Sequence, residues 1–236
     1  MSGQIIAANI EKVLSEIDSC LVHCGRKHDD LRLMAVSKFN SIEKILEAAA
    51  CGLNLFGESR VQEACEKFDS IRTTQNAAKY ELHMIGSLQR NKVKSAVKIF
   101  DCVQSVDRNE LIEELGKASL SEKKQISILL ELNSGEESKS GYADCDALFY
   151  AAESALKHSY LKIAGLMTMA PNTENPKIIS KAFSSVRSAQ NKLQTMFPAA
   201  DWSCLSMGMS GDFKIAIAEG STLVRIGTAI FGDRTV

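Results

Sequence analysis

The sequence predicts a (β/α)8 barrel, the TIM-barrel architecture, with one extra helix at the amino-terminal end. Three observations support this fold: the chain has 236 residues, short apolar runs alternate with amphipathic segments, and eight such runs occur. Alternation of this kind is typical of βαβ units, whose strands pair in parallel. Eight units in a chain of this length favour a closed barrel, and we expect residues 1–236 to form one domain.

The individual elements follow from the same periodicity. Residues 4–23 place apolar side chains at spacings of three and four, which predicts the leading amphipathic helix. The predicted strands are residues 31–36, 53–56, 82–85, 100–106, 125–132, 161–167, 202–206 and 223–226. The predicted helices between them are residues 41–50, 59–69, 88–98, 107–117, 143–157, 174–196 and 211–219.

An open doubly wound sheet is the alternative architecture. It usually has fewer strands and carries a glycine-rich turn after the first one. Here that turn reads Ser37-Lys38-Phe39-Asn40 and contains no glycine. The barrel is therefore the favoured prediction.

Composition limits the classes of function. Lys+Arg is 28 and Asp+Glu is 29, a formal net charge of -1, which does not indicate a nucleic-acid-binding surface. The apolar runs are too short to span a membrane, and the amino-terminal segment carries Glu11 and no basic region typical of a secretion signal. We therefore expect a cytoplasmic protein.

The seven cysteines do not form a recognisable metal motif. No Cys-x-x-Cys occurs; Cys20 and Cys24 could share a helix face, but a second pair of ligands is missing. Reduced thiols packed as small apolar groups are the better interpretation. We predict no metal site.

Active sites of (β/α)8 barrels lie at the carboxyl ends of the strands, and the loops after strands seven and eight commonly bind phosphate. Here these loops contain Ser206, Gly208, Gly227 and Thr228. Glycines allow backbone N–H groups to approach a phosphate, and hydroxyl groups add donors. The alternative is that they are ordinary turn residues.

Lys38 follows the first predicted strand and would face this phosphate site across the barrel mouth. That placement suggests a Schiff base with a phosphorylated carbonyl compound, either a sugar phosphate or pyridoxal phosphate. Partial burial and a nearby Arg225 would both lower the pKa of Lys38 and expose its nucleophilic amine. A lysine that simply ends a strand at the surface is the ordinary alternative.

Arg225 lies in the apolar run Leu-Val-Arg-Ile-Gly. A guanidinium has no acceptor, so beside a pyridine nitrogen it would keep that nitrogen unprotonated. The alternative is a structural ion pair with a carboxylate such as Glu58.

Several motifs extend this reasoning to most of the chain. They read AVSK, FGESRVQE, HMIGSLQRNK, SVDR, SKSG, GLMTM, SMGMSGD and GSTLVRIGTAIFG. In this order, from about residue 31 to 232, the chain resembles the YggS/PROSC family of pyridoxal-phosphate-binding proteins. The resemblance implies a barrel similar to the N-terminal domain of alanine racemase, with Lys38 as the cofactor lysine. It also implies a phosphate site at Ser206, Gly208, Gly227 and Thr228, with Arg225 facing the ring nitrogen.

Two motifs depart from the family pattern. Ser59 stands where the family usually has asparagine, and Leu82 precedes His83 where tryptophan is usual. The resemblance therefore does not define which contacts the residues around Ser59 and Leu82 make at the edge of the site.

The resembled family serves vitamin B6 homeostasis and has no defining enzymatic turnover. We accordingly expect a monomeric carrier of pyridoxal 5'-phosphate, with pyridoxal-phosphate-dependent apo-enzymes as candidate recipients. A low-activity amino-acid racemase is the alternative, but it needs a second base, which alanine racemase takes from a tyrosine assisted by a further β domain. We expect no such domain, because the sequence ends at Val236, and the tyrosines at 80, 142, 150 and 160 lie outside the strand-end motifs, although Tyr142 follows SKSG.

Other polar residues have two interpretations each. His83 could act as an acid or base but is more simply a packed histidine, and Lys139 could be a second amine but is more simply a solvated loop lysine. Glu58 is expected to orient a nearby arginine or serine. Met167, Met169, Met207 and Met209 could line a ring pocket or pack without a ligand.

Overall fold

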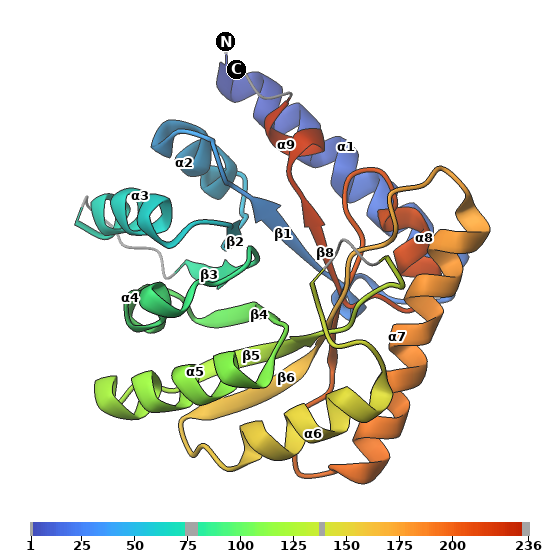
Figure 1. Ribbon diagram of the computed structural model, residues 1–236. Helices are drawn as coiled ribbons and strands as arrows, with labels where there is room; N and C mark the ends of the chain where they lie inside the picture. Colours follow the sequence, from blue (N-terminus) through green and yellow to red (C-terminus); the bar gives the residue numbers. More distant parts are fainter. Residues whose placement is uncertain (1, 74–79, 137–139, 233–236) are drawn as a thin grey trace.

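The computed structural model describes residues 2–73, 80–136 and 140–232. Its strands form a closed parallel barrel in the order β1 to β8, with β8 pairing back to β1 (Figure 1). The strands are β1 Arg32–Val36, β2 Leu55–Glu58, β3 Glu81–Met84, β4 Cys102–Val106, β5 Ile126–Glu131, β6 Leu161–Met167, β7 Cys204–Ser206 and β8 Leu223–Ile226. The predicted (β/α)8 barrel is confirmed, with strand ends shifted by up to two residues.

Helices surround the strands. They are α1 Ser2–His23, α2 Ile42–Ala50, α3 Val61–Thr73, α4 Val93–Ile99, α5 Asn109–Glu122, α6 Cys145–Leu156, α7 Pro176–Met196, α8 Phe213–Ala218 and α9 Thr228–Phe231. Two 3-10 turns, η1 His28–Asp30 and η2 Arg90–Lys92, precede β1 and α4.

Local sequence signals explain several helix ends and miss others. Asp144 caps α6 by accepting from the Ala147 N–H, and Asn175 caps α7 in the same way. The helix predicted to start at Asp107 begins later: Arg108 occupies the cap position, and the Asp107 carboxylate pairs with the Arg108 guanidinium. The predicted helix 88–98 is a 3-10 turn followed by the shorter α4.

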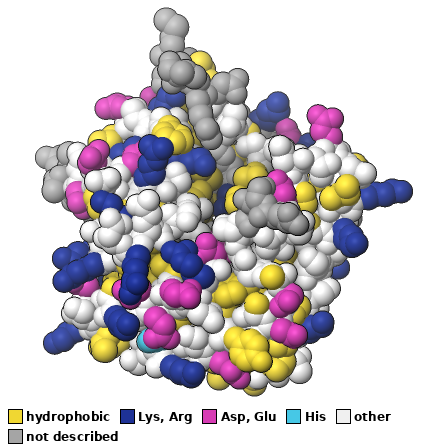
Figure 2. Space-filling model, in the orientation of Figure 1, with side chains coloured by type: hydrophobic (Ala, Val, Ile, Leu, Met, Phe, Trp, Pro, Cys, Tyr) yellow, Lys and Arg dark blue, Asp and Glu magenta, His cyan; other side chains and the backbone are white. Residues whose placement is uncertain are grey.

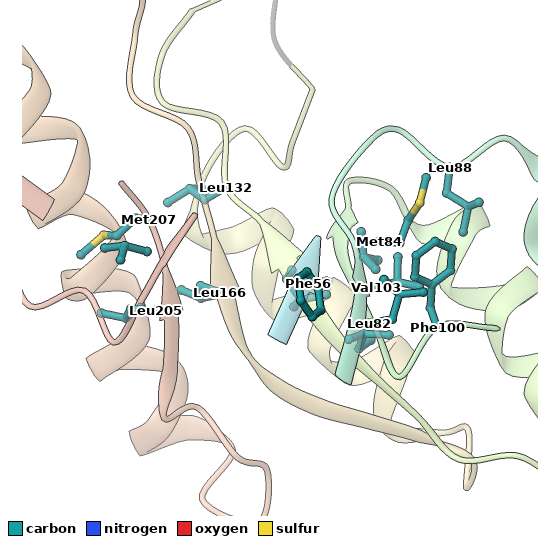
Figure 3. Packing of buried hydrophobic residues seen from close by; sticks show 14 of the residues in the cluster. Phe56, Leu82, Met84, Leu88, Phe100, Val103, Leu132, Leu166, Leu205 and Met207 are labelled. Carbon is teal, nitrogen blue, oxygen red and sulfur yellow. The ribbon is translucent and has the colours of Figure 1, made fainter. Parts of the chain in front are cut away.

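The main core lies between the barrel and its helices. Strand residues that point outward, such as Phe56, Leu82 and Val103, pack with helix residues in one continuous buried cluster. Figure 3 shows Leu82, Val103 and Phe100 lying together in this layer. Alternation along each strand sends the intervening residues into the barrel interior.

The barrel interior contains two small apolar clusters and several polar side chains. Met34, Leu55 and Leu223 form one cluster, and Cys102, Leu129 and Met167 form the other. The buried polar residues include His83, Gln104, Ser206 and Arg225. Interior polar groups are unusual enough to require a hydrogen-bonding explanation.

Helix α1 completes the outer ring at the seam between β8 and β1. The helix after β8, α9, has only four residues, and α1 packs against α9, α8 and α2 (Figure 1). The Asn9 side-chain amide donates to the Ile230 carbonyl at 3.0 Å. The leading helix therefore covers the face that a full-length eighth helix would cover.

The exterior is charged and mixed in sign. Figure 2 shows Lys and Arg side chains interspersed with Asp and Glu over one face of the molecule. Across the described ranges, no helix combines the length and apolar character needed to cross a bilayer. Within the same ranges, no group of three or more His, Cys, Asp or Glu side chains is placed to hold a metal ion.

Candidate functional site

A pocket of about 440 Å³ opens at the carboxyl end of the barrel; we call it the carboxyl-end pocket. Four of the predicted site residues line it together: Lys38, Arg225, Gly227 and Thr228. Lys44 lines it as well. Among the described residues of its wall, these lysines and the arginine are the charged side chains, and no Asp or Glu is present. Such a wall suits an anionic ligand.

The loop that carries Lys38 is fastened on both sides of that residue. Before it, the Ser37 N–H donates to the Gly57 carbonyl at 3.0 Å, and the Ser37 hydroxyl donates to Glu58 Oε1 at 2.7 Å. After it, the N–H of Phe39, whose φ is 64°, donates to Glu63 Oε1 at 2.6 Å. A left-handed backbone at a non-glycine residue is costly unless its surroundings hold it. These contacts fix the backbone of Lys38 at the pocket wall.

Lys67 and Glu58 form the support beneath this loop. The Lys67 ammonium donates to the Ser37 carbonyl at 3.1 Å, to Glu58 at 3.2 Å and to Glu63 at 2.5 Å. Glu58 is fully buried, its Oε2 has no hydrogen-bond partner among the described residues, and burial raises its pKa. The expectation that Glu58 orients a serine is met by Ser37. The alternative pairing of Glu58 with Arg225 is wrong.

Arg225 reaches the pocket from β8 while its guanidinium is held by neutral acceptors. Nη1 donates to the carbonyl and the hydroxyl of Ser206, each at 2.6 Å, and Nη2 donates to the Thr168 carbonyl at 2.8 Å. In the described parts of the chain, Arg225 has no salt-bridge partner. Burial lowers its pKa to about 10, so it stays charged at neutral pH. The remaining guanidinium surface can face a ligand.

The loop between β7 and α8 differs from the prediction. Ser206 is fully buried next to Arg225 and does not line the pocket, nor does Gly208. Gly208 has a φ of 100°, and a Cβ at this position would lie 2.6 Å from the Ala216 Cβ, so the turn requires glycine. The phosphate role of Ser206 and Gly208 stays a prediction.

Two residues beyond this turn reach the pocket instead: Ser210 and Gly211 line it, and neither was predicted. The Ala229 N–H, in the first turn of α9, donates to the Ser210 hydroxyl at 3.4 Å. The repeated serine and glycine of SMGMSG were the available signal, but the sequence does not show at which residue the chain turns.

Gly227 and Thr228 form the part of the wall beside Val36. Gly227 precedes α9, and its carbonyl accepts from the N–H groups of Ile230 and Phe231. A Cβ on Gly227 would lie 3.3 Å from the Cβ of Val36, which also lines the pocket. The absence of a side chain at Gly227 leaves room for a ligand to approach the backbone here.

The other candidate residues divide between the pocket and the core. Met167, Met169 and Met209 line the carboxyl-end pocket, whereas Met207 is buried in the main core. Ser59 lies outside the pocket wall as described, and Lys139 lies outside the described residues.

Two further candidates are packed side chains. His83 is buried and bonds to Glu81 and Gln104 near the other end of the barrel, as the packed interpretation predicts. Tyr142 is buried, its hydroxyl donates to Asn109 Oδ1 at 3.1 Å, and burial raises its pKa. Neither side chain lines the carboxyl-end pocket.

Comparisons with known proteins agree with this geometry. The family model "Alanine racemase, N-terminal domain" matches residues 15–235. A pyridoxal phosphate homeostasis protein of Vibrio cholerae is 38% identical over 230 residues, which is 97% of this chain and 96% of that protein. The Escherichia coli K12 protein of the same name is 36% identical over 97% of each chain.

The chain belongs to the pyridoxal phosphate homeostasis protein family. Among solved structures, PipY of Synechococcus elongatus with PLP bound superposes with a TM-score of 0.84 at 31% identity, over 96% of this chain and 100% of that one. Alanine racemase of Clostridium difficile matches with a TM-score of 0.78 at 12% identity, over 99% of this chain and 58% of that one. The latter likeness shows a shared fold, in agreement with the family's expected relation to the racemase barrel.

Proposed function

We propose that this protein binds pyridoxal 5'-phosphate as a Schiff base on Lys38 and serves the intracellular homeostasis of that cofactor, without strong catalytic turnover. The observation that carries the proposal is the meeting of Lys38, Arg225, Gly227 and Thr228 in one pocket whose described charged side chains are all cationic. A volume of about 440 Å³ is in the range of small-ligand sites. The bound cofactor would supply an aldehyde for the amine and an electron-withdrawing ring.

Each residue has a defined task in this proposal. The Lys38 amine is the covalent attachment point. Arg225 faces the ring nitrogen and, having no acceptor, leaves it unprotonated. Gly227 and Thr228 bind the phosphate, and Ser210 is positioned to add a hydroxyl. For Ser206 and Gly208, which lie behind this wall, the phosphate role stays a prediction.

The composition of the wall favours holding the cofactor over racemising an amino acid. Racemisation needs a second base that moves a proton on the opposite face of the substrate. The described wall contains no tyrosine, histidine or carboxylate. Tyr142, the tyrosine nearest to a motif, has its hydroxyl bonded to Asn109.

We further propose that the protein is a cytoplasmic monomer that releases its cofactor to pyridoxal-phosphate-dependent apo-enzymes. A Schiff base is reversible, so the same bond that stores the reactive aldehyde can return it. The mixed charge of the face in Figure 2 supports a soluble surface without a large apolar patch there. Light scattering of the cofactor-loaded protein should give the molecular mass of a single chain.

Reduction with borohydride tests the attachment. The purified protein should show the absorption band of the bound cofactor. Peptide mapping after reduction should place the adduct on Lys38. The variant Lys38→Ala should lose the adduct, whereas Lys44→Ala, at the same wall, should keep it. An adduct on another lysine alone, or a colourless protein trapped only with a sugar-phosphate substrate, would overturn the proposal.

A pair of activity measurements tests the carrier role. The loaded protein should activate an apo-enzyme of known cofactor dependence and should not racemise alanine or serine. Sustained racemisation that disappears in Lys38→Ala would show that the carrier interpretation is wrong.

A further inference from the structure

A continuous line of hydrogen bonds crosses the barrel interior from Arg225 to Glu81. Arg225 bonds to the Ser206 hydroxyl at 2.6 Å, and that hydroxyl bonds to Gln104 Oε1 at 2.6 Å. Gln104 Nε2 lies 2.7 Å from His83 Nδ1, and His83 Nε2 lies 2.7 Å from Glu81 Oε1. The line joins β8, β7, β4 and β3, whose residues lie far apart in sequence.

The chemistry of these groups gives the line one direction. A guanidinium only donates, so the Ser206 oxygen accepts and its single hydrogen goes to Gln104 Oε1. The Gln104 amide then donates to His83 Nδ1, which leaves the hydrogen of His83 on Nε2, facing the Glu81 carboxylate. Every group on the line donates toward Glu81. Gln104 is the central member, because its separate donor and acceptor connect two partners that are otherwise out of reach of each other.

The surroundings make this line costly to break. Ser206 and Gln104 are fully buried, and His83 and Arg225 are at most 5% exposed. The apolar clusters around Met34 and around Cys102 occupy the same interior. Ser206 and Gln104 have no exposed surface, so a hydroxyl or amide there that lost its partner would have no water to replace it.

We propose that Gln104 is a positioning residue for the cofactor site, which it does not touch: through Ser206 it holds the Arg225 guanidinium in place behind the carboxyl-end pocket. Arg225 has no carboxylate partner among the described residues, so its orientation depends on the Ser206 hydroxyl and on two carbonyls. Gln104 fixes which way the Ser206 hydroxyl points. The proposal rests on the proposed function only for what Arg225 faces when the cofactor is bound.

Three variants test the proposal. Gln104→Met removes both hydrogen bonds at similar volume, and Gln104→Glu keeps the acceptor for Ser206 but cannot donate to His83. Gln190→Met is the control, since Gln190 is a partly buried glutamine whose side-chain amide donates to a carbonyl, that of Trp202, in the outer layer. Gln104→Leu, which also removes both hydrogen bonds, serves if Gln104→Met does not fold.

The first measurement uses the protein without cofactor. Nitrogen-15 NMR should show His83 protonated on Nε2 alone in the native sequence and in Gln190→Met. In Gln104→Glu, His83 should be protonated on both nitrogens, because a carboxylate only accepts. A native His83 protonated on Nδ1 would overturn the direction of the line, and with it the proposal.

The second measurement uses the loaded protein. Gln104→Met should shift the absorption band of the bound cofactor and speed its release at least threefold. Gln104→Glu, which keeps the acceptor for Ser206, should change both much less, and Gln190→Met should change neither. A band and a release rate equal to those of Gln190→Met, in a folded Gln104→Met that still carries the Lys38 adduct, would overturn the proposal while leaving the proposed function intact, and so would equal effects of Gln104→Met and Gln104→Glu. If the native protein forms no Lys38 adduct, the proposed function fails, and the NMR result still decides the hydrogen-bond line.

Discussion

The two ends of the barrel hold pockets of the same size and opposite charge. The amino-end pocket also measures about 440 Å³, and it is lined by acidic residues and two basic ones: Asp29, Asp30, Glu81, Asp101, Asp201, Arg32 and Lys162. The described wall of the carboxyl-end pocket has Lys38, Lys44 and Arg225 and no acid. Volume alone therefore does not distinguish a binding site in this barrel, whereas the sign and pairing of the wall charges do.

At the amino-end pocket, Arg32 and His83 both pair with Glu81. Arg32 Nη2 donates to Glu81 Oε2 at 2.5 Å, and His83 contacts the other oxygen of the same carboxylate. The hydrogen bond from His83 is the main cause that lowers the pKa of Glu81 to about 2, and Arg32 adds to it. Arg225, at the carboxyl end, has only neutral acceptors. An unpaired buried cation remains available to a ligand, and a paired one does not.

The largest expected effect comes from reversing the charge at the carboxyl end. Arg225→Glu should shift the spectrum of the bound cofactor, since the ring nitrogen would then be protonated, and should weaken retention. It should also lower the free energy of unfolding by about 3 kcal/mol or more, because three hydrogen bonds of a buried charged group are lost. Absorption spectra and urea unfolding measure the two effects.

The matched change at the amino end is Arg32→Gln. Arg32 is about half exposed, so we expect a loss of at most about 1 kcal/mol and an unchanged spectrum. If Arg225→Glu also left spectrum and affinity unchanged, Arg225 would be a structural residue only.

A smaller effect should follow from Gly208→Ala at the turn behind the carboxyl-end pocket. A left-handed φ of 100° and a Cβ 2.6 Å from the Ala216 Cβ should together cost about 2–4 kcal/mol. Gly25→Ala is the control: its φ is 66°, nothing lies within 4 Å of an added Cβ, and the cost should be about 1 kcal/mol. Equal urea midpoints for the two variants would mean that the loop around Gly208 shifts to accept the added Cβ without extra strain.

The pH dependence of the free energy of unfolding below pH 7 should distinguish Glu81 from Glu58. The pKa of Glu81 is about 2 in the folded protein against 4.5 as the reference, so its contribution is present above pH 4.5 and is lost as the pH falls toward 2. Since its side chain is 39% exposed, the contribution should be only about 1 kcal/mol. Glu81→Gln should therefore be less stable than the native protein at pH 6 and equal to it at pH 2.

Glu58→Gln should show the opposite slope. The pKa of Glu58 is raised, so the native protein loses stability relative to this variant as the pH rises from 4.5 through the folded pKa. Urea unfolding from pH 2 to 7 measures both variants. Parallel curves would contradict the pairing described for the two carboxylates.

The smallest effect concerns one lysine at each end. Lys44→Ala should weaken binding of inorganic phosphate by about two- to fivefold, from the loss of one nearby charge, and the effect should shrink as salt is added. Lys162→Ala, in the amino-end pocket, should leave phosphate affinity unchanged. Equal losses in both variants would indicate that net charge, and not the pocket, sets the affinity.

Periodicity was sufficient for the barrel but not for its shortest helices. The eight strands are short apolar runs with clear boundaries, and the predicted ranges overlap all of them. Helix α9 was not predicted, because four residues are too few to show a helical period. The start of α4 was predicted too early. The polar residues of the 3-10 turn η2 lead directly into α4, and no residue in the sequence marks the boundary between them.

The site was predictable where a residue follows directly from a strand end. Lys38, Arg225, Gly227 and Thr228 meet because parallel strands bring their carboxyl ends together. The partners of Arg225 were not predictable: Ser206 bonds to Gln104 across 102 positions of sequence, and a glutamine within an apolar strand gives no local signal of this contact. Which side chains share the barrel interior depends on the strand register, which the sequence does not display.

The seam at α1 has a consequence for synthesis of the protein on the ribosome. The buried face of α1, formed by Ile6, Ile10, Val13, Ile17 and Leu21, is covered partly by α8 and α9, which are made some 200 residues later. The Arg26 guanidinium likewise donates to the carbonyls of Ile217 and Ser221, which are synthesised just as late. Helix α1 must therefore keep an apolar surface without its final cover while the rest of the barrel is synthesised. A nascent chain halted before β8 should accordingly be held by chaperones that recognise apolar helices, and one released past α9 should not.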